Sequence, residues 1–341
     1  MYSFRNDYSE GAHPRILELL SNSNYEANIG YGKDIHSHKA KEYIKKLIEK
    51  EDADIHFIPG GTQTNMLVIS SFLRPHQCVI SADTGHINVH ETGAIEATGH
   101  KVVAMPCKDG KLTPDIIKKA LDYHTDEHMV QPKMVYISSS TELGTIYSKD
   151  ELISIHKICK ENGLLLFLDG ARLGSALTCR SNDLNIKDIA NLVDIFYIGG
   201  TKNGALLGEA LIILNQDLKE DFRFLIKQRG AMAAKGFVLG IQFEALFQDD
   251  LYFELARHAN EMAERLGSII QEAGYKFYTE PYTNQIFPIF PDTLLEKMEK
   301  EFVYEFIDKV DENNTAVRFV TSWATKIEAV EALRDFFNKN K

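Results

Sequence analysis

Two stretches of sequence decide the fold of this chain: LLLFLDGAR at Leu164–Arg172 and DIFYIGGTKNG at Asp194–Gly204. Each contains a short apolar run, and a run of this length predicts a strand that is buried on both faces of a sheet. Asp169 directly follows the first run, and Lys202 follows the second run behind two glycines. Because active sites of parallel sheets gather at the carboxyl ends of the strands, we expect this carboxylate and this amine to lie there.

An aspartate and a lysine placed in this way are what pyridoxal 5'-phosphate (PLP) requires. A lysine amine can bond the aldehyde carbon of the cofactor, and a carboxylate can keep the pyridine nitrogen protonated so that the ring accepts electrons. The competing interpretations are a solvated loop lysine and an aspartate that caps a helix starting at Ala171. Burial of an unpaired carboxylate is costly, which favours a cationic partner for Asp169. Arg172 carries a fork suited to a carboxylate or a phenolate oxygen, although a surface ion pair would also explain it.

The segment PGGTQTN at Pro59–Asn65 predicts a phosphate site. It is a glycine-rich turn between a predicted strand and an apolar-periodic helix, and backbone N–H groups at such a helix start can hold a phosphate together with a threonine hydroxyl. It is neither a Walker A loop nor a G-x-G-x-x-G motif. A Gly-Gly turn by itself is most often only a turn. It supports a phosphate site only because Asp169 and Lys202 also predict a PLP site.

The segment HINVHE at His86–Glu91 places two histidines four residues apart. On a helix this spacing could bind a metal ion. No third ligand follows at a convincing spacing, so we expect no metal. An imidazole could instead stack on a flat aromatic cofactor, although either histidine alone is more often a hydrogen-bonded structural residue.

The alternation of short apolar runs with amphipathic stretches, from about Glu51 to Leu214, predicts an α/β fold. The expected strands are Ile55–Ile58, Cys78–Ser81, Val102–Met105, Met134–Ser138, Leu164–Leu168, Ile195–Ile198 and Ala210–Leu214. The expected helices between them include Thr62–Phe72, Pro114–Tyr123 and Lys149–Glu161. Because runs such as Leu164–Leu168 are apolar on both faces, we expect a mostly parallel sheet covered by helices on both sides.

The C-terminal part of the chain predicts a smaller α+β domain. A long helix is expected from near Lys235 to about Ala273. Beyond it we expect strands at Gln285–Phe290 and Ala316–Thr321, and helices near Leu294–Val310 and Lys326–Asn338. The prediction is therefore an N-terminal segment with a large cofactor-binding domain, residues 1–240, and a small C-terminal domain, residues 241–341.

Bulk composition narrows the class of protein. The chain has 341 residues with 38 basic and 49 acidic side chains, a net charge of −11, which argues against nucleic acid or an anionic membrane as a partner. The cysteines are scattered without a C-x-x-C pair, as is typical of reduced thiols in a cytoplasmic protein. The N-terminus has no apolar signal-peptide core, and the longest apolar runs are too short to span a membrane.

Taken in order, the motifs resemble the threonine aldolase family, PLP enzymes of the aspartate-aminotransferase fold (fold type I) in the β-eliminating lyase group. The matching motifs run nearly end to end: Arg5-Asn6-Asp7, Tyr31-Gly32, Gly60–Asn65, His86 with Glu91, Asp169–Arg172, Thr201-Lys202 and Val317–Thr321. The lysine motif is closest to a sub-branch that reads G-x-T-K rather than S-K-G.

The resemblance implies a role for each residue. Lys202 would bond PLP, Asp169 would pair with its pyridine nitrogen, and His86 would stack on the ring. Gly61 and Thr62 would hold the phosphate. The resemblance also places Thr201 and Arg172 beside the cofactor. The substrate carboxylate would bind Arg172 and Arg318 with Asn6, and Tyr31 would lie near the substrate.

The resemblance further implies a homotetramer built from tight dimers, in which a neighbouring subunit completes each site. Basic residues of that neighbour often reach the phosphate in this family, and Lys227 or Arg229 could do so here. The implied partners are therefore a small amino-acid substrate and further copies of this chain.

Two departures from the family pattern bear on the mechanism. Many members have a Thr-His-Asn motif near the substrate hydroxyl, where this chain has Thr141-Glu142-Leu143. Asn6 stands where serine is common. The first departure leaves the catalytic base open among His86, Glu91, Glu142 and a held water molecule. It also leaves open any preference between threonine and allo-threonine.

The expected reaction is aldol cleavage of L-threonine, L-allo-threonine or related L-3-hydroxy amino acids to glycine and an aldehyde. A PLP-dependent β-eliminating lyase or an aminotransferase on the same fold is the nearest alternative. A non-catalytic PLP-binding protein and a doubly wound protein without PLP are the remaining ones. Fold alone does not decide among these, since one scaffold hosts many reactions.

Overall fold

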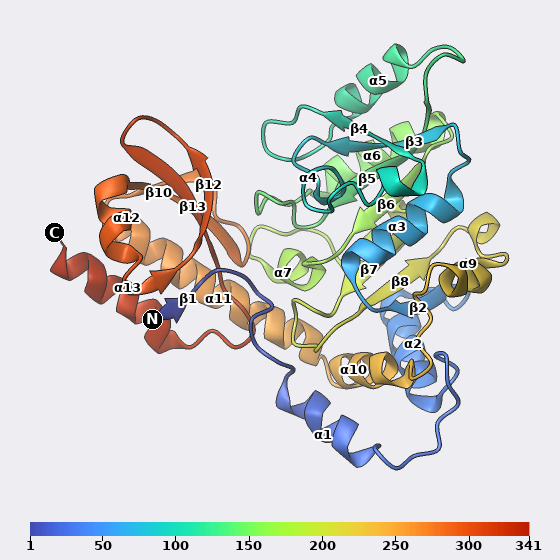
Figure 1. The fold of residues 1–341 in the computed structure, drawn as a ribbon, viewed down its shortest axis with the longest axis horizontal. Helices are drawn as coiled ribbons and strands as arrows, with labels where there is room; N and C mark the ends of the chain where they lie inside the picture. The colour runs from blue at the N-terminus through green and yellow to red at the C-terminus, as the bar shows by residue number, and fades with distance from the viewer. Residues whose placement is uncertain (341) are drawn as a thin grey trace.

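The computed structural model describes residues 1–340, and its centre is a seven-stranded sheet in the order β2-β8-β7-β6-β5-β3-β4 (Figure 1). The strands are β2 Asp54–Ile58, β3 Gln77–Ala82, β4 Lys101–Met105, β5 Gln131–Ser138, β6 Leu165–Asp169, β7 Ile195–Gly199 and β8 Glu209–Ile213. Strands β3 to β7 run parallel, whereas β8 is antiparallel to both of its neighbours. The seven expected strands and the mostly parallel sheet are confirmed.

Helices cover both faces of this sheet. One face packs against α3 Gly61–Phe72 and α9 Phe222–Gln228, and the other packs against α2 Ile35–Ile48, α5 Pro114–Tyr123, α6 Lys149–Glu161, α8 Ile186–Leu192 and α10 Phe237–Phe247. Strand side chains alternate between the two cores, as the pleat requires. In β7, Phe196 and Ile198 join the second core, whereas Ile195 and Tyr197 join the first.

Local sequence explains where the helices begin. Ser148 caps α6, because its Oγ accepts from the Glu151 N–H while Glu151 Oε2 accepts from the Ser148 N–H. Thr113 caps α5, and Pro114 occupies its first turn. Both helices have the bounds expected from the sequence. The shorter helices are α1 Pro14–Asn22, α4 His86–Val89 and α7 Leu173–Thr178, with 3-10 turns at Glu96–Thr98 and Gln216–Leu218.

The single long helix expected between Lys235 and Ala273 is wrong. The chain forms α10 and then α11, Leu251–Glu272, with a break between them. Asp250 precedes α11 with a φ of 61°, a left-handed conformation that cannot continue a right-handed helix. Asp249, also in the break, accepts from Arg15 Nη2 at 2.6 Å. Helix α11 then runs from the large sheet into the C-terminal unit (Figure 1).

The C-terminal unit contains a four-stranded antiparallel sheet in the order β12-β13-β10-β9. Its elements are β9 Lys276–Thr279, β10 Gln285–Pro291, α12 Asp292–Met298, β12 Glu305–Lys309, β13 Asn314–Val320 and α13 Ile327–Lys339. The expected β10, β13 and α13 are confirmed. The helix expected at Leu294–Val310 is wrong beyond Met298, because Glu305–Lys309 pairs with β13 as an edge strand.

The first residues of the chain pack on this C-terminal unit. Strand β1, Tyr2–Ser3, pairs in parallel with β11, Phe302–Val303. Phe4 is fully buried, and its ring stacks on those of Phe302 and Phe319. A domain boundary at residue 240 stays a prediction. None of the helices within residues 1–340 is long and apolar enough to cross a membrane.

Candidate active site

A cavity of about 350 Å³ lies at the carboxyl ends of β6 and β7, where the sequence predicts the site. The predicted site residues that line it are Gly61, Thr62, His86, Glu142, Asp169, Arg172, Thr201 and Lys202. Asn6, Tyr31, Glu91, Arg229 and Arg318 do not line it. Lining residues that sequence reasoning missed include Tyr8, Ser138, Ser140, Tyr197, Leu207 and Glu209.

Asp169 ends β6 as a buried carboxylate surrounded by donors. Its Oδ1 accepts from the Tyr197 hydroxyl at 2.5 Å and the Ala171 N–H at 3.0 Å. Its Oδ2 accepts from the Tyr136 hydroxyl at 2.5 Å and Asn65 Nδ2 at 3.3 Å. Burial alone would raise the pKa of Asp169, but nearby positive charge at His86 and these hydrogen bonds lower it. The site therefore holds a fixed negative charge at the floor of the cavity.

His86 is the first residue of α4, and its side chain lines the cavity. Its Nδ1 lies 2.8 Å from Glu91 Oε1, which also accepts from Asn65 Nδ2 at 2.8 Å. Glu91 is buried and does not line the cavity. Glu91 therefore fixes the orientation of the imidazole through Nδ1, and Nε2 is the other ring nitrogen. The contact makes Glu91 a positioning residue in this arrangement.

Glu142 brings a second carboxyl group to the cavity wall. Its Oε1 accepts from the His86 N–H at 3.0 Å and from Ser138 Oγ at 2.9 Å. Burial and the nearby charge of Asp169 raise the pKa of Glu142. A carboxyl group whose pKa is raised toward neutrality can both take up and return a proton in a reaction.

Lys202 lies in the turn after β7, and glycines make room for that turn. A Cβ at Gly200 would lie 2.8 Å from the Gly208 carbonyl oxygen, so only glycine fits there. Burial and the positive charge of Arg172 lower the pKa of Lys202. A lower pKa favours the neutral amine, which is the nucleophilic form. The Lys202 ammonium lies 6.0 Å from the centre of the Tyr8 ring.

Glu209 is a buried carboxyl group beneath the lysine turn that the sequence analysis did not select. Its Oε1 accepts from Thr201 Oγ1 at 3.0 Å, and its Oε2 accepts from the Gly200 N–H at 3.1 Å. Burial raises the pKa of Glu209 to about 8. The signal that could have found it is an acidic residue at the start of an otherwise apolar strand, β8.

Arg172 is held by Asp7, which comes from the N-terminal arm. Arg172 Nε donates to Asp7 Oδ2 at 2.7 Å, and Nη2 donates to Oδ1 at 3.0 Å. Asn284 Nδ2 also donates to Asp7 Oδ2, at 2.9 Å. Burial would raise the pKa of Asp7, but the charges of Arg172 and Lys202 lower it. The ion pair of Arg172 is therefore buried at the cavity rather than exposed on the surface.

Arg318 and Asn6 lie beside this pair but outside the cavity lining. Arg318 belongs to β13, and its buried Nε has no hydrogen-bond partner among residues 1–340. Burial and the positive charge of Arg172 lower the pKa of Arg318. Asn6 Oδ1 accepts from the Tyr8 N–H at 3.0 Å and from Ser9 Oγ at 2.9 Å. Arg318 thus has donor capacity that no residue of the described chain uses.

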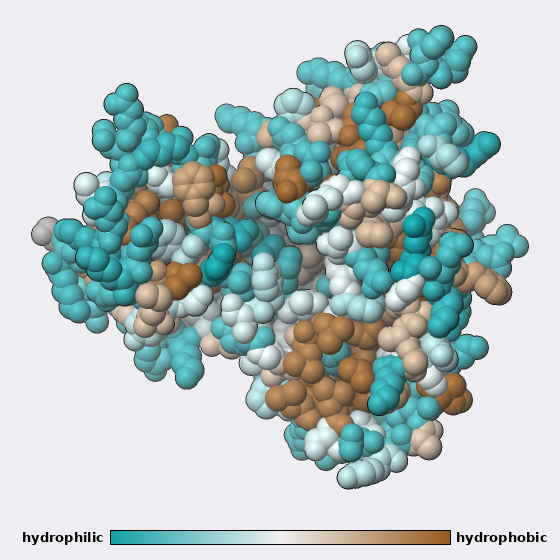
Figure 2. Space-filling model, viewed as in Figure 1, coloured by the Kyte–Doolittle hydropathy of each residue, from teal (hydrophilic) through white to brown (hydrophobic). Residues whose placement is uncertain are grey.

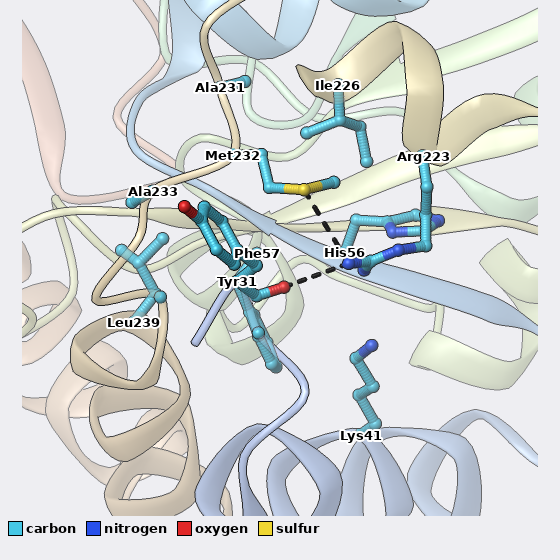
Figure 3. A pocket seen from close by; sticks show the side chains of 12 residues that line it. Tyr31, Lys41, His56, Phe57, Arg223, Ile226, Ala231, Met232, Ala233 and Leu239 are labelled. Carbon is cyan, nitrogen blue, oxygen red and sulfur yellow. Dashed lines mark hydrogen bonds between the residues drawn. The ribbon is translucent and has the colours of Figure 1, made fainter. Parts of the chain in front are cut away.

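Tyr31 and Arg229 lie away from the cavity of their own chain. Tyr31 lines a different pocket, shown in Figure 3, and the Lys227 ammonium lies 4.7 Å from the centre of its ring. Arg229 is exposed at the end of α9. Across residues 1–340 no three His, Cys, Asp or Glu side chains converge as metal ligands would.

Residues 15–292 match the family model described as β-eliminating lyase. The chain belongs to the β-eliminating lyase family. A low specificity L-threonine aldolase of Pseudomonas aeruginosa is 32% identical and covers 97% of this chain and 95% of that relative. A solved structure of threonine aldolase from Leishmania major is 50% identical in sequence. The match covers 100% of this chain and 99% of the Leishmania chain, with a TM-score of 0.99.

The fold type also extends to more distant structures. An aspartate aminotransferase structure from Thermus thermophilus, 13% identical, covers 99% of this chain and 91% of its own at a TM-score of 0.74. The expected resemblance, fold type I, lyase class and PLP dependence are therefore confirmed. A doubly wound protein without PLP is excluded as an alternative.

The residues present fit PLP. Buried Asp169 needs a cationic partner, which a protonated pyridine nitrogen supplies, and Lys202 has the lowered pKa of an amine that forms a covalent bond. Helix α3 begins at Gly61 on the cavity wall without a side-chain cap, so its first N–H groups can bind a phosphate. A Cβ at Gly61 would come within 3.4 Å of the Tyr197 hydroxyl, and glycine keeps this wall open.

Proposed function

We propose that this member of the β-eliminating lyase family cleaves L-threonine, L-allo-threonine and related L-3-hydroxy amino acids to glycine and an aldehyde. The observation that carries the proposal is the carboxyl group of Glu142 in the same cavity as Lys202 and Asp169. Cleavage of the Cα–Cβ bond requires removal of the β-hydroxyl proton, and Glu142 is a proton acceptor placed at the wall. Relatives across nearly the full chain bear the name threonine aldolase, which supports the same reaction.

Lys202 would hold PLP, and the chemistry that the cofactor would supply is a protonated ring that accepts the electron pair of the breaking bond. Asp169 would hold the protonated ring nitrogen, and its four hydrogen bonds keep it in place. Gly61 and Thr62 would bind the phosphate at the start of α3. His86, fixed by Glu91, would lie against the ring. The placement of these residues and their charges support these roles.

The substrate carboxylate would bind the two arginines at the edge of the cavity. Asp7 occupies the Nε and Nη2 donors of Arg172, so Arg172 would offer Nη1. Arg318 would offer its unpartnered Nε, and Asn6 would add its amide group. Fixing the carboxylate in this way sets which bond at Cα lies perpendicular to the ring.

Proton transfer would fall to Glu142 and Lys202. Glu142 would take the β-hydroxyl proton, because a raised pKa makes its carboxylate a stronger proton acceptor. Lys202 would return a proton to Cα, since its lowered pKa favours an amine that exchanges protons. The hydrogen bonds from Thr201 and Gly200 to Glu209 would hold the lysine turn in place during both steps. Glu91 reaches the reaction only through His86.

The test measures release of aldehyde and glycine from L-threonine and from L-allo-threonine, side by side with PLP present. Release from either substrate supports aldol cleavage, and the ratio gives the stereochemical preference. Pyruvate with ammonia would indicate β-elimination instead, and a requirement for a keto acid would indicate an aminotransferase. Bound PLP without turnover of any amino acid would indicate a binding protein.

We further propose a homotetramer of tight dimers with shared active sites, located in the cytoplasm. Tyr31, Lys227 and Arg229 lie outside their own cavity and would reach a neighbour's site. Figure 2 shows an apolar patch near α10, and exposed Leu206, whose N–H bonds Gln242 of that helix, adds to the apolar surface there. Light scattering gives the mass. Mixing Lys202→Ala with Arg229→Gln chains should restore activity if sites are shared.

A further inference from the structure

A second pocket with a basic lining lies away from the active-site cavity, between α2, β2 and the segment that follows α9 (Figure 3). Its inner space is about 30 Å³, and an outer space of about 350 Å³ shares Gly32, Lys41 and Arg223 with it. The inner space has room for one or two water-sized groups. It therefore suits the oxygen atoms of a small ion and excludes an organic ring.

Lys41 is a largely buried cation without a partner. It lies on α2, and Figure 3 shows its side chain directed into the pocket. Within residues 1–340 its ammonium group makes no hydrogen bond or ion pair, although other lysines of the same helix do, such as Lys39 with Glu244 at 3.0 Å. Burial lowers the pKa of Lys41 most and the charge of Arg223 lowers it further, whereas the charges of Asp54 and Asp34 raise it. An unpaired buried charge is costly unless something fills the place of its partner.

Arg223 is the second cation, and it also lacks a carboxylate. Its Nη2 donates to the Tyr31 carbonyl oxygen at 3.1 Å and lies 3.7 Å from Met232 Sδ (Figure 3). No carboxylate of the described chain lies within ion-pair distance of it. The remaining donors of its guanidinium group are arranged as a fork, the geometry that binds two oxygens of an oxyanion.

Two carboxylates lie near the pocket: Asp34 lines its outer space, and Asp54 acts on Lys41 through its charge. Asp34 accepts from the Ser37 N–H and from Ser37 Oγ, both at 2.8 Å, as the cap of α2. Asp54 Oδ2 lies 2.9 Å from His56 Nε2. Burial lowers the pKa of His56, so the imidazole adds no lasting positive charge. Asp34 and Asp54 thus offset part of the positive charge, but no carboxylate of the described chain pairs directly with Lys41 or Arg223.

We propose that this pocket binds a small inorganic oxyanion of the size of phosphate, held between the Lys41 ammonium and the Arg223 guanidinium groups. One or two oxygens fill the inner space, and the rest of the ion lies in the outer space beside Lys33. The bound ion separates two like charges and gives each a partner. The proposal is independent of the reaction catalysed in the other cavity.

The experiment measures thermal unfolding of the holoenzyme while inorganic phosphate replaces chloride at constant pH and ionic strength. PLP fills the active site, so its phosphate-binding residues are not available, and the PLP absorption band is recorded in the same samples. A ligand that binds only the folded protein raises the unfolding temperature with concentration. We expect this rise in the wild type, with the PLP band unchanged, and isothermal titration should give one phosphate per chain.

The variants separate a binding site from a structural role. Lys41→Gln should raise the unfolding temperature in chloride, because it removes an unpaired buried cation, and should weaken phosphate binding at least tenfold. Arg223→Gln should weaken it similarly. Lys46→Gln, an exposed position on the same helix, is the matched control and should bind phosphate as the wild type does.

Four outcomes would overturn the proposal. The wild type could show no phosphate-dependent rise. Lys41→Gln and Arg223→Gln could retain the full rise. Chloride could stabilise as well as phosphate, which would leave no oxyanion site. The rise could come with a changed PLP band, which would place the ion in the active site.

Discussion

Replacing Arg318 by glutamine tests whether its unused donor serves the substrate. In the free protein the buried Nε of Arg318 has no acceptor, and the charge of Arg172 lowers its pKa. A partly buried cation with a buried, unpartnered N–H is preorganised for an incoming carboxylate. The substitution keeps a polar side chain of similar length but removes the charge. It should therefore affect substrate binding more than stability.

The magnitude follows from the interaction that is lost. A hydrogen bond to a charged group contributes about 1.5–3 kcal/mol, which corresponds to a change of roughly 10- to 150-fold in an equilibrium constant. We expect kcat/KM for L-threonine to fall by about this factor in Arg318→Gln, mainly through KM. Resistance of the cofactor-free protein to urea should be unchanged or higher, because no native partner of Nε is lost.

The assay is the initial rate of aldehyde release over a range of L-threonine concentrations, with urea unfolding of the same preparations. Arg5→Gln is the matched control: Arg5 is an exposed arginine that pairs with Glu305 at 2.6 Å, and such surface pairs contribute little to stability. Its kinetics should match the wild type. The reasoning is refuted if Arg318→Gln keeps a wild-type KM, or if it unfolds at clearly lower urea concentration.

Further substitutions probe the other buried charges of the cavity. Lys202→Ala should abolish turnover, and full activity would rule out its covalent role. Asp169→Asn should lose most activity while circular dichroism stays native; a small loss would mean that the pyridine nitrogen pairs elsewhere. Asp7→Asn should cost about 3–5 kcal/mol of unfolding free energy in urea, since it leaves buried Arg172 uncompensated; a cost below 1 kcal/mol, about that of a surface pair, contradicts a buried pair. The pKa of Glu209 is raised from an ordinary 4.5 to about 8, so the folded state keeps this proton to higher pH than the unfolded state does. The contribution of Glu209 to stability is therefore lost as pH rises from 4.5 through 8. Glu209→Gln should therefore gain stability over the wild type, in the cofactor-free protein, more at pH 9 than at pH 6; equal differences at both pH values would refute this.

The sequence predicted the elements whose signal is local. The strand at Leu164–Leu168 is apolar on both faces, and α6 carries its own capping box, so both could be located from a few consecutive residues. The segment Glu305–Lys309 carries no decisive periodicity, and only its pairing with β13 makes it a strand. The break at Asp250 likewise depends on packing rather than on propensity.

The site was predictable only as far as its motifs extend. Asp169 and Lys202 follow short apolar runs and could be found from them. The pairing of Asp7 with Arg172 joins residues 165 positions apart, and no local pattern announces such a contact. In the sequence Glu209 is only an acidic residue at the start of a strand. Its role becomes visible only in the hydrogen bonds that it accepts from Gly200 and Thr201. Long-range hydrogen bonds between side chains therefore account for most of what the sequence alone could not give.

The position of the N-terminal arm sets when the catalytic cavity can form during synthesis. Residues Tyr2–Ser3 pair with Phe302–Val303, and the Val320 N–H donates to the Phe4 carbonyl oxygen. The arm that carries Asp7 and Tyr8 is thus held by residues that the ribosome adds after the whole large sheet has been made. A chain interrupted before Phe302 can complete most of the large sheet, but it cannot bring Asp7 to Arg172. Formation of the cavity then waits for synthesis of β11 and β13, although the large sheet has already been made.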